Sequence, residues 1–68
     1  MNVYYVIVQY GRGEMRTTTL VAANTEKEAN KLARADAPVP CYDGDVTCTL
    51  IRDLTYTGPD PVVIRRVG

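Results

Sequence analysis

The chain has 68 residues and a mass of 7.5 kDa, which is enough for one small domain and excludes a second. Hydrophobic residues make up 46% and charged residues 24%, as in chains that fold rather than stay disordered. Eight basic and eight acidic residues give a net charge of zero, which argues against a nucleic-acid-coating protein and against an acidic DNA mimic. We therefore expect a single domain over residues 1–68.

The residue types that are absent narrow the possible functions. The sequence contains no His and no Ser, the commonest general base and the commonest hydroxyl nucleophile. Cys41 has no imidazole to activate it, and Gly11-Arg12-Gly13 precedes a predicted strand rather than the helix that a phosphate-binding loop requires. We therefore predict that the protein is not an enzyme and uses no cofactor.

The two cysteines, Cys41 and Cys48, have six residues between them. Without His, one cysteine pair is two ligands short of a structural zinc site, and Asp43-Gly44-Asp45 lacks the remaining ligands of a calcium loop, so we predict no metal. The cysteines could form a disulfide in a secreted or oxidised protein. The alternative is two reduced thiols, with Cys48 as a small core residue.

No targeting signal is recognisable in the sequence. The first residues lack the basic segment and apolar run of a signal peptide. No apolar stretch approaches the roughly 18 residues of a membrane span. We expect a soluble, cytoplasmic protein.

Two strands are predicted first. Residues 3–10 are β-branched and aromatic on both alternating faces, which predicts a central strand. Gly11-Arg12-Gly13 supplies a tight turn, and residues 15–23 return as the second strand of a hairpin.

The clearest local signal is a helix start at Thr25. Its hydroxyl can accept from the Glu28 N–H while the Glu28 carboxylate reaches back to the Thr25 N–H, which is a capping box. The helix should run to residue 34 or 35 and present a narrow, mostly Ala face, so it must lie close to the sheet. The prolines in residues 36–40 end it.

Residues 46–55 predict a third strand, and residues 62–67 a short fourth strand whose preceding prolines suit a sheet edge. We therefore predict an α+β fold of order β-β-α-β-β. Its four-stranded antiparallel sheet would have the strand order 2-1-3-4 and one helix on one face. The opposite face would be left to water or to a partner.

That uncovered face is the first candidate binding surface. If residues 46, 48 and 50 point to the helix, Thr47, Thr49 and Ile51 point away from it, and Thr17 and Thr19 should join them. One set of the tyrosines Tyr4, Tyr5 and Tyr10 should lie there too, since Tyr is enriched at interface hot spots. The alternative is that Tyr replaces Phe in the core and that the Thr pairs only stabilise a solvated sheet.

Basic residues form the second candidate. Arg12 at the hairpin tip and Arg16 nearby could contact phosphate or an acidic groove. Lys27, Lys31 and Arg34 recur at helical spacing and form one basic stripe, which could follow a phosphate backbone. The alternative is that these side chains are merely solvated, with Glu28 pairing with Lys31.

The run from Leu20 to Ala33, in which a strand ending Val-x-Ala leads to a polar cap and a small apolar helix face, resembles small phage-encoded anti-CRISPR proteins, particularly compact inhibitors of type I surveillance complexes. The resemblance implies a stoichiometric inhibitor, active in the cytoplasm of an infected bacterium, that blocks DNA binding or nuclease recruitment. A nucleic-acid-binding domain using the basic residues and a module that oligomerises through residues 62–67 are the alternatives.

Overall fold

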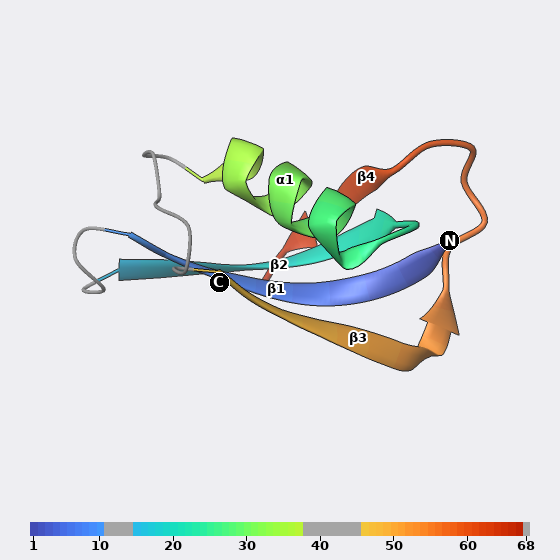
Figure 1. Ribbon diagram of the computed structural model, residues 1–68, viewed down its shortest axis with the longest axis horizontal. Helices are drawn as coiled ribbons and strands as arrows, with labels where there is room; N and C mark the ends of the chain where they lie inside the picture. The colour runs from blue at the N-terminus through green and yellow to red at the C-terminus, as the bar shows by residue number, and fades with distance from the viewer. Residues whose placement is uncertain (11–14, 38–45, 68) are drawn as a thin grey trace.

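The structure is a computed structural model that describes residues 1–10, 15–37 and 46–67, with the backbone alone of Tyr10. Each strand is antiparallel to the strand it pairs with, and the helix lies on one face of the sheet (Figure 1). The predicted α+β class and β-β-α-β-β order are confirmed. The elements are β1 (Asn2–Tyr10), β2 (Met15–Ala23), α1 (Glu26–Asp36), β3 (Val46–Thr55) and β4 (Val62–Arg66).

The strand order is β3-β1-β2-β4, and the predicted order 2-1-3-4 is wrong. β3 pairs with β1 as predicted, but β4 pairs with β2 at the opposite edge of the sheet. The burial of β2 gives the physical reason, since Val21, Ala22 and Ala23 have no exposed surface. An inner position covers such a strand on both sides, whereas an edge position would leave its backbone groups unpaired.

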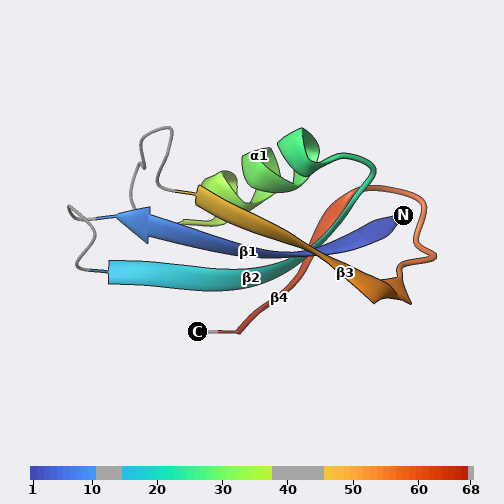
Figure 2. The same ribbon diagram turned by 60° about the horizontal axis from the view of Figure 1, so that its bottom comes forward.

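A short connection carries the chain from one edge of the sheet to the other. Residues 56–61 leave β3, pass the N-terminus and reach β4 (Figures 1 and 2). Three strand spacings amount to about 14 Å, and an extended chain over this stretch spans up to about 24 Å, so the link is long enough. The Tyr56 N–H donates to the Met1 carbonyl (3.0 Å) and the Met1 nitrogen donates to the Tyr56 carbonyl (2.8 Å), which holds the link beside β1.

Local hydrogen bonds fix the ends of α1. The Thr25 hydroxyl accepts from the Glu28 N–H at 3.2 Å, which confirms the predicted N-cap. The Glu28 carboxylate accepts from the N–H of Asn24 at 3.0 Å, one residue before the predicted partner. At the other end, the N–H of Ala37 donates to the Arg34 carbonyl at 3.2 Å, so the helix ends one or two residues later than predicted.

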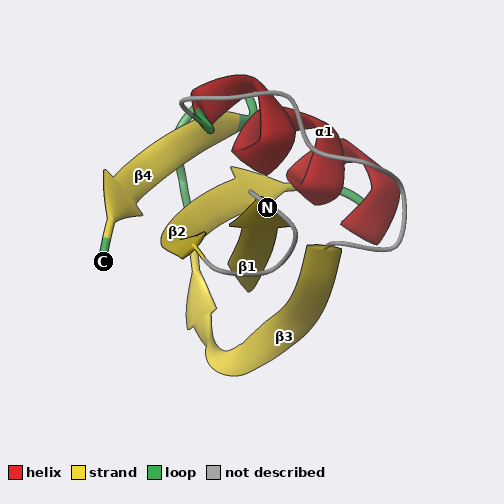
Figure 3. Ribbon diagram, turned by 90° about the vertical axis from the view of Figure 1, so that its left-hand side faces the viewer, coloured by secondary structure: helices red, strands yellow, loops and turns green. Residues whose placement is uncertain are grey.

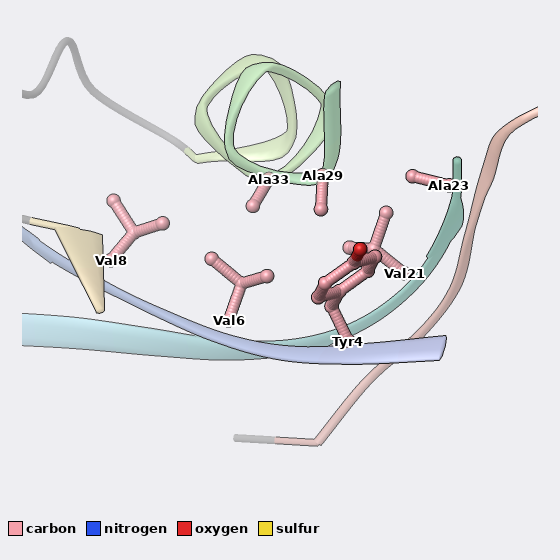
Figure 4. Packing of buried hydrophobic residues seen from close by; sticks show 7 residues of the cluster. All are labelled: Tyr4, Val6, Val8, Val21, Ala23, Ala29 and Ala33. Atoms are coloured by element: carbon pink, nitrogen blue, oxygen red, sulfur yellow. The ribbon is translucent and has the colours of Figure 1, made fainter. Parts of the chain in front are cut away.

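The core lies between α1 and the two central strands. Ala29 and Ala33 have no exposed surface and point down onto the sheet (Figure 4). Because Ala carries only a methyl group, the helix axis can approach the strands closely, as its composition predicted. The side chains beneath it are Tyr4, Val6, Val8, Val21 and Ala23.

The strand register assigns every side chain to a face. Val46, Cys48 and Leu50 pair with Val8, Val6 and Tyr4, so they lie on the helix side, as predicted. Thr17 and Thr19 were expected on the other face, and that prediction is wrong. They pair with Val8 and Val6 and are 5% and 0% exposed, because successive residues of a strand alternate between faces and it is Thr18 that points away from α1.

The buried hydroxyl of Thr19 generates a test of stability. Neither Thr17 nor Thr19 has a hydrogen-bond partner for its Oγ1 within the described residues. A buried hydroxyl without a partner costs about 1–3 kcal/mol, so we expect Thr19→Val to raise the free energy of unfolding by about 1–2 kcal/mol. Urea denaturation measures this difference.

The matched control is Thr49→Val on the helix-free face, where the side chain is exposed and the expected change is within about 0.5 kcal/mol. Destabilisation by Thr19→Val relative to this control would show that the Thr19 hydroxyl is satisfied in the folded protein.

Candidate functional site

Tyr4, one of the predicted binding residues, is part of the core. Its side chain is 7% exposed and lies beneath α1, next to Val21 (Figure 4). Its hydroxyl accepts from the Asn2 side-chain amide at 3.3 Å, so the polar end is satisfied at the rim of the core. This placement removes Tyr4 from the predicted binding surface and matches the alternative that the sequence left open for a tyrosine.

Several other predicted positions cannot be assigned to a surface. Tyr10 ends β1 opposite Met15, and its side chain lies outside the described residues. Arg12, Cys41 and the segment Asp43-Gly44-Asp45 also lie outside them.

Tyr5 lies on the helix-free face, at the centre of a row of side chains that crosses all four strands. It pairs with Leu20 on one side and with Thr49 on the other, and Leu20 in turn pairs with Arg65. Tyr5 and Leu20 are half-buried, whereas Thr49 and Arg65 are exposed. The row therefore has an apolar centre and polar ends.

A second row runs beside the first. Ile7 pairs with Thr18 and with Thr47, and the Val67 N–H donates to the Thr18 carbonyl at 2.7 Å. Further along the same face, the exposed Arg16 pairs with Gln9. Arg16 thus shares a face with Tyr5, and together these residues form what we call the open face: Tyr5, Ile7, Gln9, Arg16, Thr18, Leu20, Thr47, Thr49 and Arg65.

The open face is closed off at one end. Val3 and Ala22 belong to the same side of the sheet as Tyr5, yet they are 3% and 0% exposed. Between Ile51, which pairs with Val3, and Thr55, which pairs with Asn2, the register shifts and β3 bends. Figure 3 shows β3 curving beneath β1 and β2, away from α1. The surface available to a partner is therefore the middle and the hairpin end of the face.

The predicted basic stripe lies on the other side of the sheet and borders an open groove of about 600 Å³. Lys27, Lys31 and Arg34 are brought together there, as their helical spacing predicted. They face away from Arg16, so the predicted basic residues do not form one continuous surface. The described residues lining the groove are Glu26, Lys27, Asn30, Lys31 and Arg34.

Cys48 lies close enough to Glu26 for the charge of that carboxylate to act on its thiol. It is a half-buried free thiol on β3 and packs against the core beneath α1, which is the core role foreseen for it. Two effects together raise the pKa of the Cys48 thiol from 9.0 to about 11: chiefly its burial, and to a lesser extent the negative charge of Glu26. The thiol is therefore protonated near neutral pH and is a poor nucleophile.

Sequence reasoning missed several residues of both surfaces. Alternation along β1 from Tyr5 would have identified Ile7, because the two share a face. Leu20 and Arg65 required the register between strands, and Arg65 also required the correct strand order. The sequence predicted the basic stripe on α1 but gave no sign of the groove beside it.

Among residues 1–10, 15–37 and 46–67, no three His, Cys, Asp or Glu side chains are grouped so that they could hold a metal ion. Over the same residues, no helix, α1 included, has the length and the apolar character needed to cross a membrane.

The raised pKa of Cys48 predicts slow alkylation. In a Cys41→Ser variant, Cys48 is the remaining thiol. We expect iodoacetamide to react with it at pH 8 up to about 100-fold more slowly than with a cysteine of pKa 9. The reaction rate should rise with pH until about pH 11. Glu26→Gln should accelerate the reaction because it removes the nearby charge. Asp60→Asn is the control, and equal acceleration by both changes would contradict the role of Glu26.

The same shift affects stability. The folded state favours the protonated thiol. The contribution of Cys48 to the free energy of unfolding should therefore be fully present below about pH 9 and be lost as the pH rises towards 11. Cys48→Ala in urea denaturation at pH 8 and pH 11 measures this difference.

Comparison with models of known protein families, with curated proteins and with solved structures gives no match. No relative therefore assigns a role to the open face or to the groove. Their residues, exposure and charge are what the function must be inferred from.

Proposed function

We propose that the protein is a small accessory protein that inhibits a larger host assembly by binding to it stoichiometrically, with no chemistry of its own. The open face is the contact surface in this proposal. The observation that carries it is the row Thr49, Tyr5, Leu20 and Arg65, which crosses the sheet. The row lies on the side of the sheet that α1 leaves uncovered, and Figure 2 shows the ribbon turned so that this side comes forward.

The composition of the open face suits contact with another protein. Interfaces have an apolar centre, a polar rim and an excess of Tyr and Arg. Here Tyr5, Ile7 and Leu20 provide the centre, and Arg16 and Arg65 lie towards its margins. Because the sheet already fixes the backbone, binding would cost only the ordering of side chains and not that of a loop.

The host assembly that we propose is a type I CRISPR surveillance complex, in the cytoplasm of an infected bacterium. This choice rests on the resemblance of the run from Leu20 to Ala33 to phage-encoded inhibitors. Because the net charge is zero, we favour contact with a protein subunit over direct competition with DNA.

Two alternatives remain predictions. A nucleic-acid-binding function is supported by Lys27, Lys31 and Arg34 around one groove, but Arg16 lies on the opposite face and cannot extend that footprint. Oligomerisation through residues 62–67 is supported by the position of β4 at the sheet edge and by the exposed side chains of Val62 and Ile64.

The test is binding to a purified type I surveillance complex together with a CRISPR interference assay. We expect co-elution in size-exclusion chromatography at a fixed stoichiometry, and loss of interference when the two are co-expressed. Tyr5→Thr and Leu20→Thr should each weaken binding at least about tenfold, since buried central residues carry most of the interface energy. Thr is compatible with a strand, so the fold should be retained.

Leu50→Thr is the matched control. It makes the same chemical change on β3 at a residue that is 43% exposed and lies on the helix side of the sheet. Its affinity should equal that of the unchanged protein. Absence of any complex with intact interference would refute the proposed target, and equal effects of Leu20→Thr and Leu50→Thr would refute the proposed surface.

A further inference from the structure

The outer edge of β3 has no strand beside it among the described residues. β3 stands first in the order β3-β1-β2-β4, so it pairs with β1 on one side only. A strand at a sheet edge presents a row of backbone N–H and C=O groups that can pair with a further strand. The groups along this side of β3 therefore match the backbone of another extended segment.

The first part of β3 lacks the features that protect most edge strands. Such strands are commonly protected by charged side chains, by prolines, by bulges or by being very short. Residues 46–51, Val-Thr-Cys-Thr-Leu-Ile, contain no charge, no Pro and no Gly, and they pair with β1 in an unbroken register. Arg52, Asp53 and the register shift come only after them. We call residues 46–51 the β3 edge.

The opposite edge of the sheet is better protected. β4 has five residues, and Pro59 and Pro61 come before it. Its pairing with β2 contains a register shift, and Arg65 and Arg66 bring two charges into the strand. The β3 edge is therefore the more favourable of the two for pairing with a further strand.

The side chains of the β3 edge differ between the two faces of the sheet. Val46, Cys48 and Leu50 lie on the helix side, and Leu50 is 43% exposed there because α1 reaches only part of β3. Thr47 and Thr49 belong to the open face and are exposed. One face of the edge is thus apolar and the other carries hydroxyl groups.

We propose that the β3 edge pairs with the β3 edge of a second copy of this chain, antiparallel and centred on Cys48. Directly opposite residues of an antiparallel pair point to the same face. In this register Val46 of one copy meets Leu50 of the other on the helix side. On the open face, Thr47 of one copy meets Thr49 of the other.

The β3 edge is complementary to itself in this register. The apolar pair of Val46 with Leu50 occurs twice and covers the exposed Leu50 side chain, and the Thr pair also occurs twice. The pairing is symmetric, so it closes as a dimer and does not grow into a fibre. Arg52 and Asp53 lie outside the paired stretch, residues 46–50.

The inference goes beyond the proposed function. Since Thr47 and Thr49 keep their place on the open face, the two four-stranded sheets would join into one and present both open faces on the same side. Such a dimer would contact two equivalent sites on a partner.

The first test is sedimentation velocity of the purified protein from about 10 μM to about 1 mM. Five residues a side are far fewer than the roughly 20–30 of a standard interface, so we expect a weak dimer that forms towards the upper end of this range. Leu50→Thr should raise its dissociation constant about tenfold, because the contact with Val46 occurs twice. Leu54→Thr is the matched control, since Leu54 is 50% exposed on β3 beyond the paired stretch, and it should leave the constant unchanged.

Disulfide trapping tests the register. Thr47→Cys and Thr49→Cys are prepared as two separate proteins in a background of Cys41→Ser and Cys48→Ala. Directly opposite residues have Cα atoms about 4.5–5.5 Å apart, within the range of a disulfide. Mild oxidation of the mixture should give mainly the linked heterodimer, whereas either protein alone should remain largely unlinked.

Three outcomes would overturn the proposal. A monomer at every concentration up to about 1 mM would refute the dimer. Equal effects of Leu50→Thr and Leu54→Thr would refute the β3 edge, and so would loss of the dimer in Ile64→Lys alone, which would place the contact on β4. Leu20→Thr, which should weaken binding to the host assembly, should leave the dimer unchanged. The dimer and the proposed function therefore fail separately.

Discussion

The close approach of α1 to the sheet is the contact on which the rest of the structure depends. Ala29 and Ala33 replace larger side chains at the contact, so the helix rests directly on Val6, Val8 and Val21. A helix held this close covers β1 and β2 well but reaches only part of β3, where Leu50 is 43% exposed. A single short helix cannot cover both faces of four strands, and the distribution of exposed surface follows from that limit.

Both candidate surfaces are consequences of this packing. The open face exists because α1, the one helix among the described residues, lies on the side of the sheet opposite Tyr5, Ile7 and Leu20. The groove runs along the polar side of α1 that carries Lys27 and Lys31. The other flank is closed by β4, where the Arg66 guanidinium donates to the Asp36 carboxylate at 3.0 Å and to its carbonyl. The two surfaces are therefore separated by the sheet itself.

The elements were predictable from the sequence, whereas the arrangement of β4 and the faces of β2 were not. Thr25 and Glu28 mark the helix start because capping is a contact between neighbours in the chain. The prolines before β4 indicated a position at a sheet edge, where a missing N–H leaves no neighbouring strand unpaired. Either edge of the sheet would satisfy this condition. β4 pairs with β2 because this arrangement buries Val21, Ala22 and Ala23. The three consecutive threonines of β2 show no alternation of apolar and polar residues, so the sequence did not indicate which threonines point inward. For the same reason Thr17 and Thr19 were placed on the wrong face.

The sequence by itself determined the strand and helix boundaries to within one or two residues, the class of the fold and the basic stripe on the helix, since each depends on residues within a few positions of one another. Only the tertiary structure decided that Tyr4 is in the core while Tyr5 lies outside, that Arg16 and Lys31 are on opposite sides, and that Leu20 and Arg65 join one row. These facts depend on strand register and on which edge receives β4. Contacts between residues far apart in the chain set both, and a local sequence pattern does not indicate the energies of such contacts.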